Sequence, residues 1–396
     1  MSQVTPGAQH ASGRTRSIWP GVLRTLLVAL TVVAVSGASV AAIAVWRLTQ
    51  EIGGRTVSIG PAVPDVSALN GAFTVLMVGA DNAPGQTGFG AARSAALNDV
   101  NILVHIAADH RSGTVISLPR DLVIAHPQCT DPTTKQVHPP LSAQPLNEAF
   151  ARGGLACVVN TVQSLTGIPI PYAAQFTFAG TVKMADAVGG VPVCVTKAID
   201  DPKSGLKLKQ GVSVISGRTA LAYLRDRHSI GDGSDLSRIQ SQQAYMSALL
   251  RKTTSASTFS NPVALYTLAT AAAQNVTLSQ SMGAPRTMVQ MALALKSMDL
   301  AHLVFVQYPT SPDPANRAKV VPNTALAAKL TARGRHDERI ALDGKALGSA
   351  AVATGSTTTA TPRSTASPAP AKSDSATVPG LQGRTAAQRT CSVAAR

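Results

Sequence analysis

The sequence predicts an α/β protein: a mixed-sheet α/β/α sandwich, preceded by one transmembrane helix and followed by a disordered tail. A long charge-free apolar run near the N-terminus predicts the helix. Strand-like and helix-like segments intermixed over residues 71–340 predict the sandwich. Alanine, serine, threonine, proline and glycine dominate residues 346–396, which is typical of a flexible exported segment.

The apolar run covers Thr25–Val45 and contains no charged side chain. About 20 helical residues cross the hydrocarbon core of a bilayer, so we expect residues 22–46 to span the membrane. Arginines are slightly enriched before the run, which predicts that residues 1–21 form a cytoplasmic basic tail. The competing interpretation is a cleaved signal peptide, with small residues at 41–44 as the processing site. In both cases the bulk of the chain is exported, and the first case makes it a single-pass protein of the cell membrane.

The charge and the cysteines suit an exported protein. The net charge of +15 favours polyanionic surroundings, namely nucleic acid, anionic lipid or a phosphorylated wall polymer. No two cysteines have the CxxC spacing of a zinc site. In an oxidising compartment Cys129 and Cys157 are the favoured disulfide partners, and pairing with Cys194 stays open.

A linker over 47–70 leads into the globular part, where periodicity and turn residues place the elements. We expect strands over Phe73–Gly79, Val100–Ile106, Thr114–Leu118 and Val191–Thr196. We expect helices over Leu146–Ala151, Leu155–Leu165, Phe178–Val188 and Leu236 to about Arg251. Gly167 and the pair Gly189-Gly190 follow helical patterns as stop signals.

Two aspartates and an arginine lie at the ends of the first three predicted strands. Asp81 follows the first strand, Asp99 precedes the second and Arg120 follows the third. In an antiparallel meander these three positions share one edge of the sheet. Paired carboxylates beside a phosphate suit Mg²⁺, which takes few protein ligands. The alternative is that both aspartates only cap turns.

A second cluster lies in residues 223–243. If Tyr223–His228 is extended, Arg225 and Arg227 point to one face. Ser234 and Asp235 then cap the following helix, on which Arg238 and Gln242 share a face near the positive end. Three guanidiniums beside a helix N-terminus predict an anion pocket, because arginine binds phosphate oxygens bidentately.

Together these segments resemble the LytR-CpsA-Psr family, also called the cell envelope-related transcriptional attenuator domain, in its actinobacterial type. The resemblance lies in VLMVGAD (75–81), LNDVNILVHI (97–106), SLPRD (117–121), ISGRTALAYLRDR (215–227) and DLSRIQSQQ (235–243). It covers residues 71–255, and 256–340 would complete the domain.

The resemblance implies a phosphotransferase outside the cytoplasm that moves a glycopolymer from a polyprenyl-pyrophosphate carrier to peptidoglycan. It implies that Asp81 and Asp99 hold Mg²⁺ and that Asp235 and Arg120 complete the catalytic set. The pyrophosphate would be bound by Arg120, Arg225, Arg227, Arg238 and Gln242. Family members carry an arginine where Leu97 stands here, so Arg93 becomes a candidate substitute.

Three other functions remain open at this point, one of which is a non-catalytic anchor that binds the cell wall. The same pocket using water as acceptor would be a pyrophosphatase that releases lipid phosphate. The older family name suggests a membrane-bound regulator of transcription, but a membrane span before the domain turns the basic pocket away from DNA. We therefore expect a lipid-linked glycan, peptidoglycan and the cytoplasmic membrane as partners, and no nucleic acid.

Overall fold

The computed structural model describes residues 19–60, 71–81, 96–255, 261–343, 346–354 and 376–395. The chain forms two compact units, residues 1–50 and 51–396. Most of helix α1 (Trp19–Gly53) forms the first unit, and its segment Val22–Ala44 is long and apolar enough to cross a membrane. The predicted apolar helix is therefore present, while its crossing of a membrane and the direction of that crossing stay predictions.

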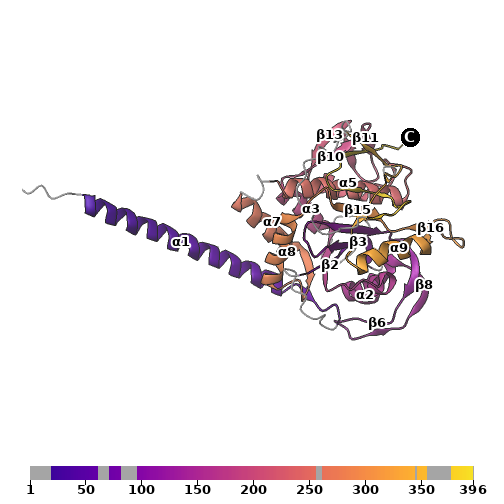
Figure 1. Cartoon of the computed structure of the whole chain (residues 1–396), viewed down its shortest axis with the longest axis horizontal. Helices are drawn as coiled ribbons and strands as arrows, with labels where there is room; N and C mark the ends of the chain where they lie inside the picture. The colour runs from indigo at the N-terminus through magenta and orange to yellow at the C-terminus, as the bar shows by residue number, and fades with distance from the viewer. Residues whose placement is uncertain are drawn as a thin grey trace, which may run out of the picture. The chain divides into compact units, whose positions relative to one another are not determined.

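An eight-stranded sheet organises the second unit (Figure 1). Its strand order is β1 (Thr56–Val57), β14 (Val276–Ser279), β9 (Tyr172–Phe176), β2 (Phe73–Asp81), β3 (Leu97–Ile106), β4 (Gly113–Leu118), β15 (Leu303–Gln307) and β21 (Gly383–Thr385). Strands β2, β3 and β4 form the predicted antiparallel meander. The β2–β9 and β4–β15 pairs are parallel, which makes the sheet mixed as expected.

Helices cover both faces of this sheet because side chains alternate along each strand. Leu76, Leu103 and Ile116 pack on one face against α2 (Ala149–Thr166) and α9 (Thr324–Arg335). Val75, Ile102 and Val115 pack on the other face against α8 (Pro285–Ser297) and α5 (Asp235–Thr253). Figure 1 shows α2 and α5 on opposite sides of the central strands. The α/β/α prediction is confirmed.

Two helical stretches lie between residues 146 and 166, separated at Gly153 and Gly154 as predicted. A short 3-10 turn, η1 (Leu146–Glu148), leads into α2, whose backbone is non-helical at these two glycines, so that α2 consists of two helices joined across a kink. The helix stops at Gly167, whose φ of 65° is left-handed and whose N–H is donated to the Gln163 carbonyl. The prediction of a break at Gly153-Gly154 and of a stop at Gly167 is confirmed.

A smaller four-stranded sheet packs beside α3 (Phe178–Ala187), α4 (Gly217–Arg225) and α5. Its strand order is β13 (Gly211–Ile215), β10 (Val191–Val195), β22 (Thr390–Ser392) and β19 (Ala351–Ala353). Within the described ranges, two-stranded pairs are also present: β11 (Ile199–Asp201) with β12 (Leu206–Leu208), β16 (Thr310–Pro312) with β17 (Val320–Pro322), β18 (Ile340–Ala341) with β20 (Ala376–Thr377), β5 (Val123–His126) with β8 (Leu141–Pro145), and β6 (Cys129–Thr130) with β7 (Val137–His138). Helix α7 (Pro262–Asn275) precedes β14.

The prediction of a disordered tail over 346–396 is wrong for the described residues 346–354 and 376–395. Strand β21 joins the large sheet beside β15, and β19 and β22 complete the small one. The segment buries Leu381 and Ala386, and Cys391 forms a disulfide with Cys194. The segment is ordered although its apolar residues are scattered, because its backbone forms hydrogen bonds with the edges of the two sheets. The predicted Cys129–Cys157 disulfide is also present.

Candidate active site

The three charged residues predicted to share a sheet edge do so. Asp81 is the last residue of β2, Asp99 lies near the start of β3, and Arg120 follows β4 by two residues. The sequence placed Asp81 just after its strand and Asp99 just before its strand. In the structure both aspartates lie within the strands. Leu97 pairs with Asp81, and its N–H is donated to Oδ1 of Asp81 at 3.1 Å.

Asp99 sits in a β-bulge. Gly79 pairs with Val100 and Ala80 pairs with Asn98, so Asp99 has no partner in the register. Asn98 donates its side-chain amide to the Asn101 side chain at 2.7 Å and to the Leu146 carbonyl, on the α2 side of the sheet. Val100 faces the opposite side, toward α5. The bulge thus places Asp99 beside Val100 on the α5 side, since an extra residue re-aims a side chain.

An ion-pair network joins this sheet edge to the N-terminus of α5. Arg120 Nη1 donates to Asp99 Oδ1 at 2.7 Å, and its Nε lies 3.6 Å from Asp235 Oδ1. Arg238 forms an ion pair with Asp235 and donates to the backbone oxygen of Asp99 at 3.2 Å. Ser234 caps the helix as predicted by accepting the N–H of Ser237 at 3.1 Å. Four predicted residues therefore meet, although they come from three elements.

Burial gives the network its electrostatic character. Arg238 and Asp235 are 6% and 9% exposed. Burial raises the pKa of Asp235, although the guanidiniums of Arg238 and Arg120 oppose this shift. Burial alone would lower the pKa of Arg120, but the carboxylates of Asp99, Asp121 and Asp235 outweigh it and raise that pKa. The guanidiniums are held in place before any ligand binds, which favours recognition of a phosphate.

Arg225 and Arg227 do not lie on a strand. Helix α4 continues through Arg225, so the expected extended segment begins only at Asp226. The Arg225 guanidinium lies over the Phe178 ring at 4.4 Å from its centroid, where a cation–π contact orients it. Arg227 is half-buried, and its charge also acts on Asp235. Arg93 lies outside the described residues, so its predicted role is not addressed.

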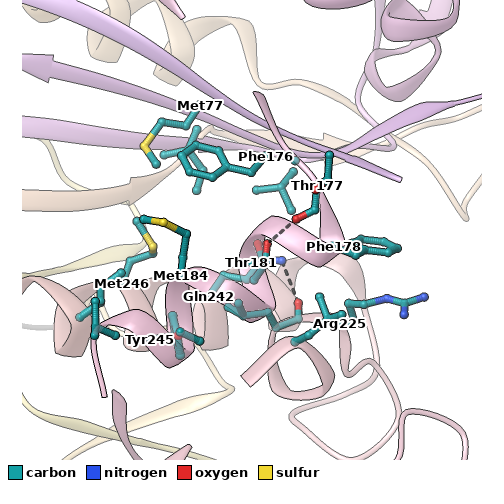
Figure 2. Close-up of a pocket in the computed structure, with 18 of the residues that line it drawn as sticks. Met77, Phe176, Thr177, Phe178, Thr181, Met184, Arg225, Gln242, Tyr245 and Met246 are labelled. Carbon is teal, nitrogen blue, oxygen red and sulfur yellow. Dashed lines mark hydrogen bonds between the residues drawn. The ribbon is translucent and has the colours of Figure 1, made fainter. Parts of the chain in front are cut away.

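Gln242 connects the charged cluster to an apolar cavity. Its Nε2 donates to the Leu224 carbonyl at 3.0 Å, which joins α5 to the end of α4. A cavity of about 300 Å³ opens between α3, α4, α5 and the sheet. Figure 2 shows Met77, Phe176 and Met184 directed toward it, with Gln242 and Arg225 along one side. Because Gln242 lies one helical turn after Arg238, the cavity adjoins the ion-pair network.

The C-terminal segment supplies support that sequence reasoning missed. The buried Arg384 of β21 donates from Nη2 to the Gln240 carbonyl of α5 at 3.1 Å, and burial lowers its pKa to about 10. Arg251, near the end of α5, donates to the Ala386 carbonyl at 2.6 Å. The composition of the segment predicted disorder and so hid the roles of these residues. In the sequence, Cys391 was the one indication that the segment belongs to the folded core.

Comparison with known proteins identifies the family. The sequence model of the LytR-CpsA-Psr family matches residues 48–333, most of the chain. The protein belongs to the LytR-CpsA-Psr family. The match confirms the resemblance read from the motifs.

Several members of this family are similar to the chain. It is 30% identical over 247 residues to the cell wall biosynthesis protein LcpA of Corynebacterium glutamicum, covering 56% of this chain and 47% of LcpA. It is 29% identical over 191 residues to the polyisoprenyl-teichoic acid–peptidoglycan teichoic acid transferase TagT of Bacillus subtilis, covering 47% of this chain and 54% of TagT. The chain thus spans about half the length of these curated relatives.

A solved structure shares the fold. The LytR-Csp2A-Psr enzyme from Actinomyces oris superposes with a TM-score of 0.52 at 25% identity, covering 71% of this chain and 95% of the other. The α/β/α sandwich of this LytR-CpsA-Psr protein is therefore a fold that it shares with this solved enzyme.

Proposed function

We propose that this LytR-CpsA-Psr protein is a membrane-anchored phosphotransferase that moves a glycopolymer from a polyprenyl-pyrophosphate carrier to peptidoglycan outside the cytoplasm. One observation carries the proposal: a buried arginine network adjoins an apolar cavity. An amphipathic ligand with an anionic head and a long apolar chain matches both parts. The transferase name of the similar TagT supports the same reaction class.

The proposed reaction forms one phosphorus–oxygen bond and breaks another. A peptidoglycan hydroxyl attacks the phosphorus that carries the glycan, and the bond to the lipid phosphate breaks. The lipid monophosphate leaves, and the hydroxyl proton passes to a carboxylate, for which the raised pKa of Asp235 is suited. Positioning and charge neutralisation dominate phosphoryl transfer, and Arg120 and Arg238 provide both.

Mg²⁺ is the proposed cofactor, held by Asp81 and Asp99. The donor set fits, because two carboxylates on neighbouring strands lie at one sheet edge and Mg²⁺ prefers oxygen ligands with several retained waters. When bound, the ion would neutralise charge on the pyrophosphate. Arg120 holds one oxygen of Asp99 and so orients the carboxylate.

Asp99→Asn is expected to raise the Mg²⁺ concentration for half-maximal activity about tenfold or more, since a neutral amide is a weaker ligand. A magnesium titration of transfer activity measures this. Asp121→Asn is the matched control, because Oδ2 of Asp121 also contacts Arg120 and lies 3.4 Å from the Arg120 Nε. An identical magnesium dependence in wild type and Asp99→Asn would remove Asp99 from the metal site.

The reaction itself is tested with the full chain, a lipid-pyrophosphoryl glycan and a peptidoglycan fragment. We expect a glycan–peptidoglycan conjugate and free lipid monophosphate in equal amounts. Release of glycan phosphate without conjugate would show a pyrophosphatase instead.

A topology reporter fused after residue 255 tests whether the domain lies outside the cytoplasm. A cytoplasmic signal would favour the membrane-bound regulator of transcription.

The cavity predicts a dependence on chain length. Met184 lines the cavity and points into it (Figure 2), so Met184→Trp should fill space needed by the lipid. We expect KM for a long-chain polyprenyl substrate to rise about tenfold, which corresponds to the lost burial of about two methylene groups. A short-chain analogue, which reaches only the charged cluster, should keep its KM. Equal effects on both substrates would place the lipid elsewhere.

A further inference from the structure

Helix α8 exposes a stripe that is both apolar and basic. Arg286, Val289, Leu293 and Lys296 recur at helical spacing on one face of the helix, all of them exposed. Val289 and Leu293 are 59% and 53% exposed. The opposite face buries Met291 and Ala294 in the core. The helix is therefore docked on the domain by one face and leaves a second apolar face uncovered.

Helix α7 also exposes apolar side chains, but it has no basic ones. It contains no charged residue from Pro262 to Asn275, yet Val263 and Tyr266 are 72% and 47% exposed. Both helices border the C-terminal half of α5: Leu268 of α7 lines the cavity beside Leu250, and Met291 of α8 packs in the core cluster that Leu250 joins. Figure 1 shows α7 and α8 on the same side of the globular unit.

Charge narrows the kind of partner that this surface fits. Residues 236–298, which include α7 and α8, contain no aspartate or glutamate. Arg286 and Lys296 lie near the two ends of the apolar stripe. Helices with apolar side chains flanked by cations and no anions are typical of structures that lie in the interface of an anionic bilayer.

Chain connectivity limits how far strand β1 can lie from the candidate membrane span. The candidate membrane span ends at Ala44, and strand β1 begins at Thr56. Thr56 pairs with Leu278 of β14, the strand that lies between α7 and α8 in the chain. The eleven intervening residues, 45–55, reach at most about 40 Å even when extended, and most of them are helical, which shortens that reach.

We propose that the exposed faces of α7 and α8 form a lipid-docking surface that rests on the anionic bilayer in which the chain is anchored. Val263, Tyr266, Val289 and Leu293 enter the interface, and Arg286 and Lys296 contact lipid phosphates. Because Leu268 of α7 is part of the cavity wall, docking brings that wall to the lipid. Entry of a polyprenyl chain into the cavity through that wall rests on the proposed function. The contact between the surface and the lipid does not.

The test uses the full chain in vesicles of phosphatidylglycerol and phosphatidylcholine. All four native cysteines form disulfides, so a nitroxide attached to Leu293→Cys labels one position. Val214→Cys on β13 is the matched control, since Val214 is also apolar and exposed but lies on the small sheet. Collision with oxygen reports lipid, and collision with an aqueous nickel complex reports water.

We expect the oxygen-to-nickel collision ratio at residue 293 to exceed that at residue 214 severalfold. Arg286→Glu combined with Lys296→Glu should abolish most of that difference, while thermal unfolding stays unchanged. Equal ratios at the two positions in anionic vesicles would overturn the proposal. So would immobilisation of the label at residue 293 in detergent as protein concentration rises, because a second copy of the chain would then cover the stripe. No substrate is present, so the result is independent of the transferase activity.

Discussion

Arg120→Ala is expected to lower kcat/KM for glycan transfer by about 10²- to 10³-fold, the usual cost of removing a pre-positioned charge that faces a transition state. Arg120 connects two parts of the site, since it contacts Asp99 on β3 and approaches Asp235 on α5. Its removal deletes a positive charge and leaves the two carboxylates without one of their cations. Steady-state kinetics with the lipid-linked substrate measure the loss.

Two controls separate a role in the reaction from a role in folding. Arg120→Lys keeps the charge but loses the planar fork, so we expect an intermediate activity. Arg152 of α2 is also partly buried and donates to the Pro127 carbonyl, outside the network. Arg152→Ala should reduce thermal stability and leave kcat/KM unchanged once the folded fraction is taken into account. If Arg120→Ala and Arg152→Ala behave alike, Arg120 acts only in folding.

The second large effect concerns the C-terminal segment. Cys194→Ser combined with Cys391→Ser is expected to lower the free energy of unfolding by about 5 kcal/mol, the loop-entropy value for a cross-link between residues 197 apart. The disulfide ties β22 to β10, and β22 also contains Ser392, which bonds the buried Tyr223 hydroxyl at 2.6 Å. Denaturant unfolding of the oxidised protein measures the change.

The second disulfide serves as the matched comparison. Cys129 and Cys157 are 28 residues apart, so their double serine variant should lose less, about 3.5 kcal/mol in the same treatment. Because Arg384 and Arg251 attach the C-terminal segment to α5, the Cys194/Cys391 variant should also lower kcat. A variant with wild-type stability would instead agree with the flexible tail that the composition suggested.

The sequence predicted the positions of the charged residues correctly where they depend on a neighbouring pattern, such as strand periodicity or a helix cap. Strand periodicity placed Asp81, Asp99 and Arg120 at one edge of the meander, and the cap at Ser234 placed Arg238 near the start of α5. The prediction failed at Arg225, because whether 223–228 is helical or extended depends on packing against α3, and a six-residue window carries no such information. The roles of these residues stay predictions until the variants are measured.

By itself the sequence determined the long apolar N-terminal helix, the α/β/α class, the meander and the family, because each depends on periodicity or on residues close together in the chain. The tertiary structure decided the rest: the bulge that turns Asp99 toward α5, the pairing of Asp235 with Arg238 and Arg120, the apolar cavity, and the order of residues 376–395. Each of these depends on contacts between distant segments. Burial, and not composition, supplies the free energy that holds such contacts in place.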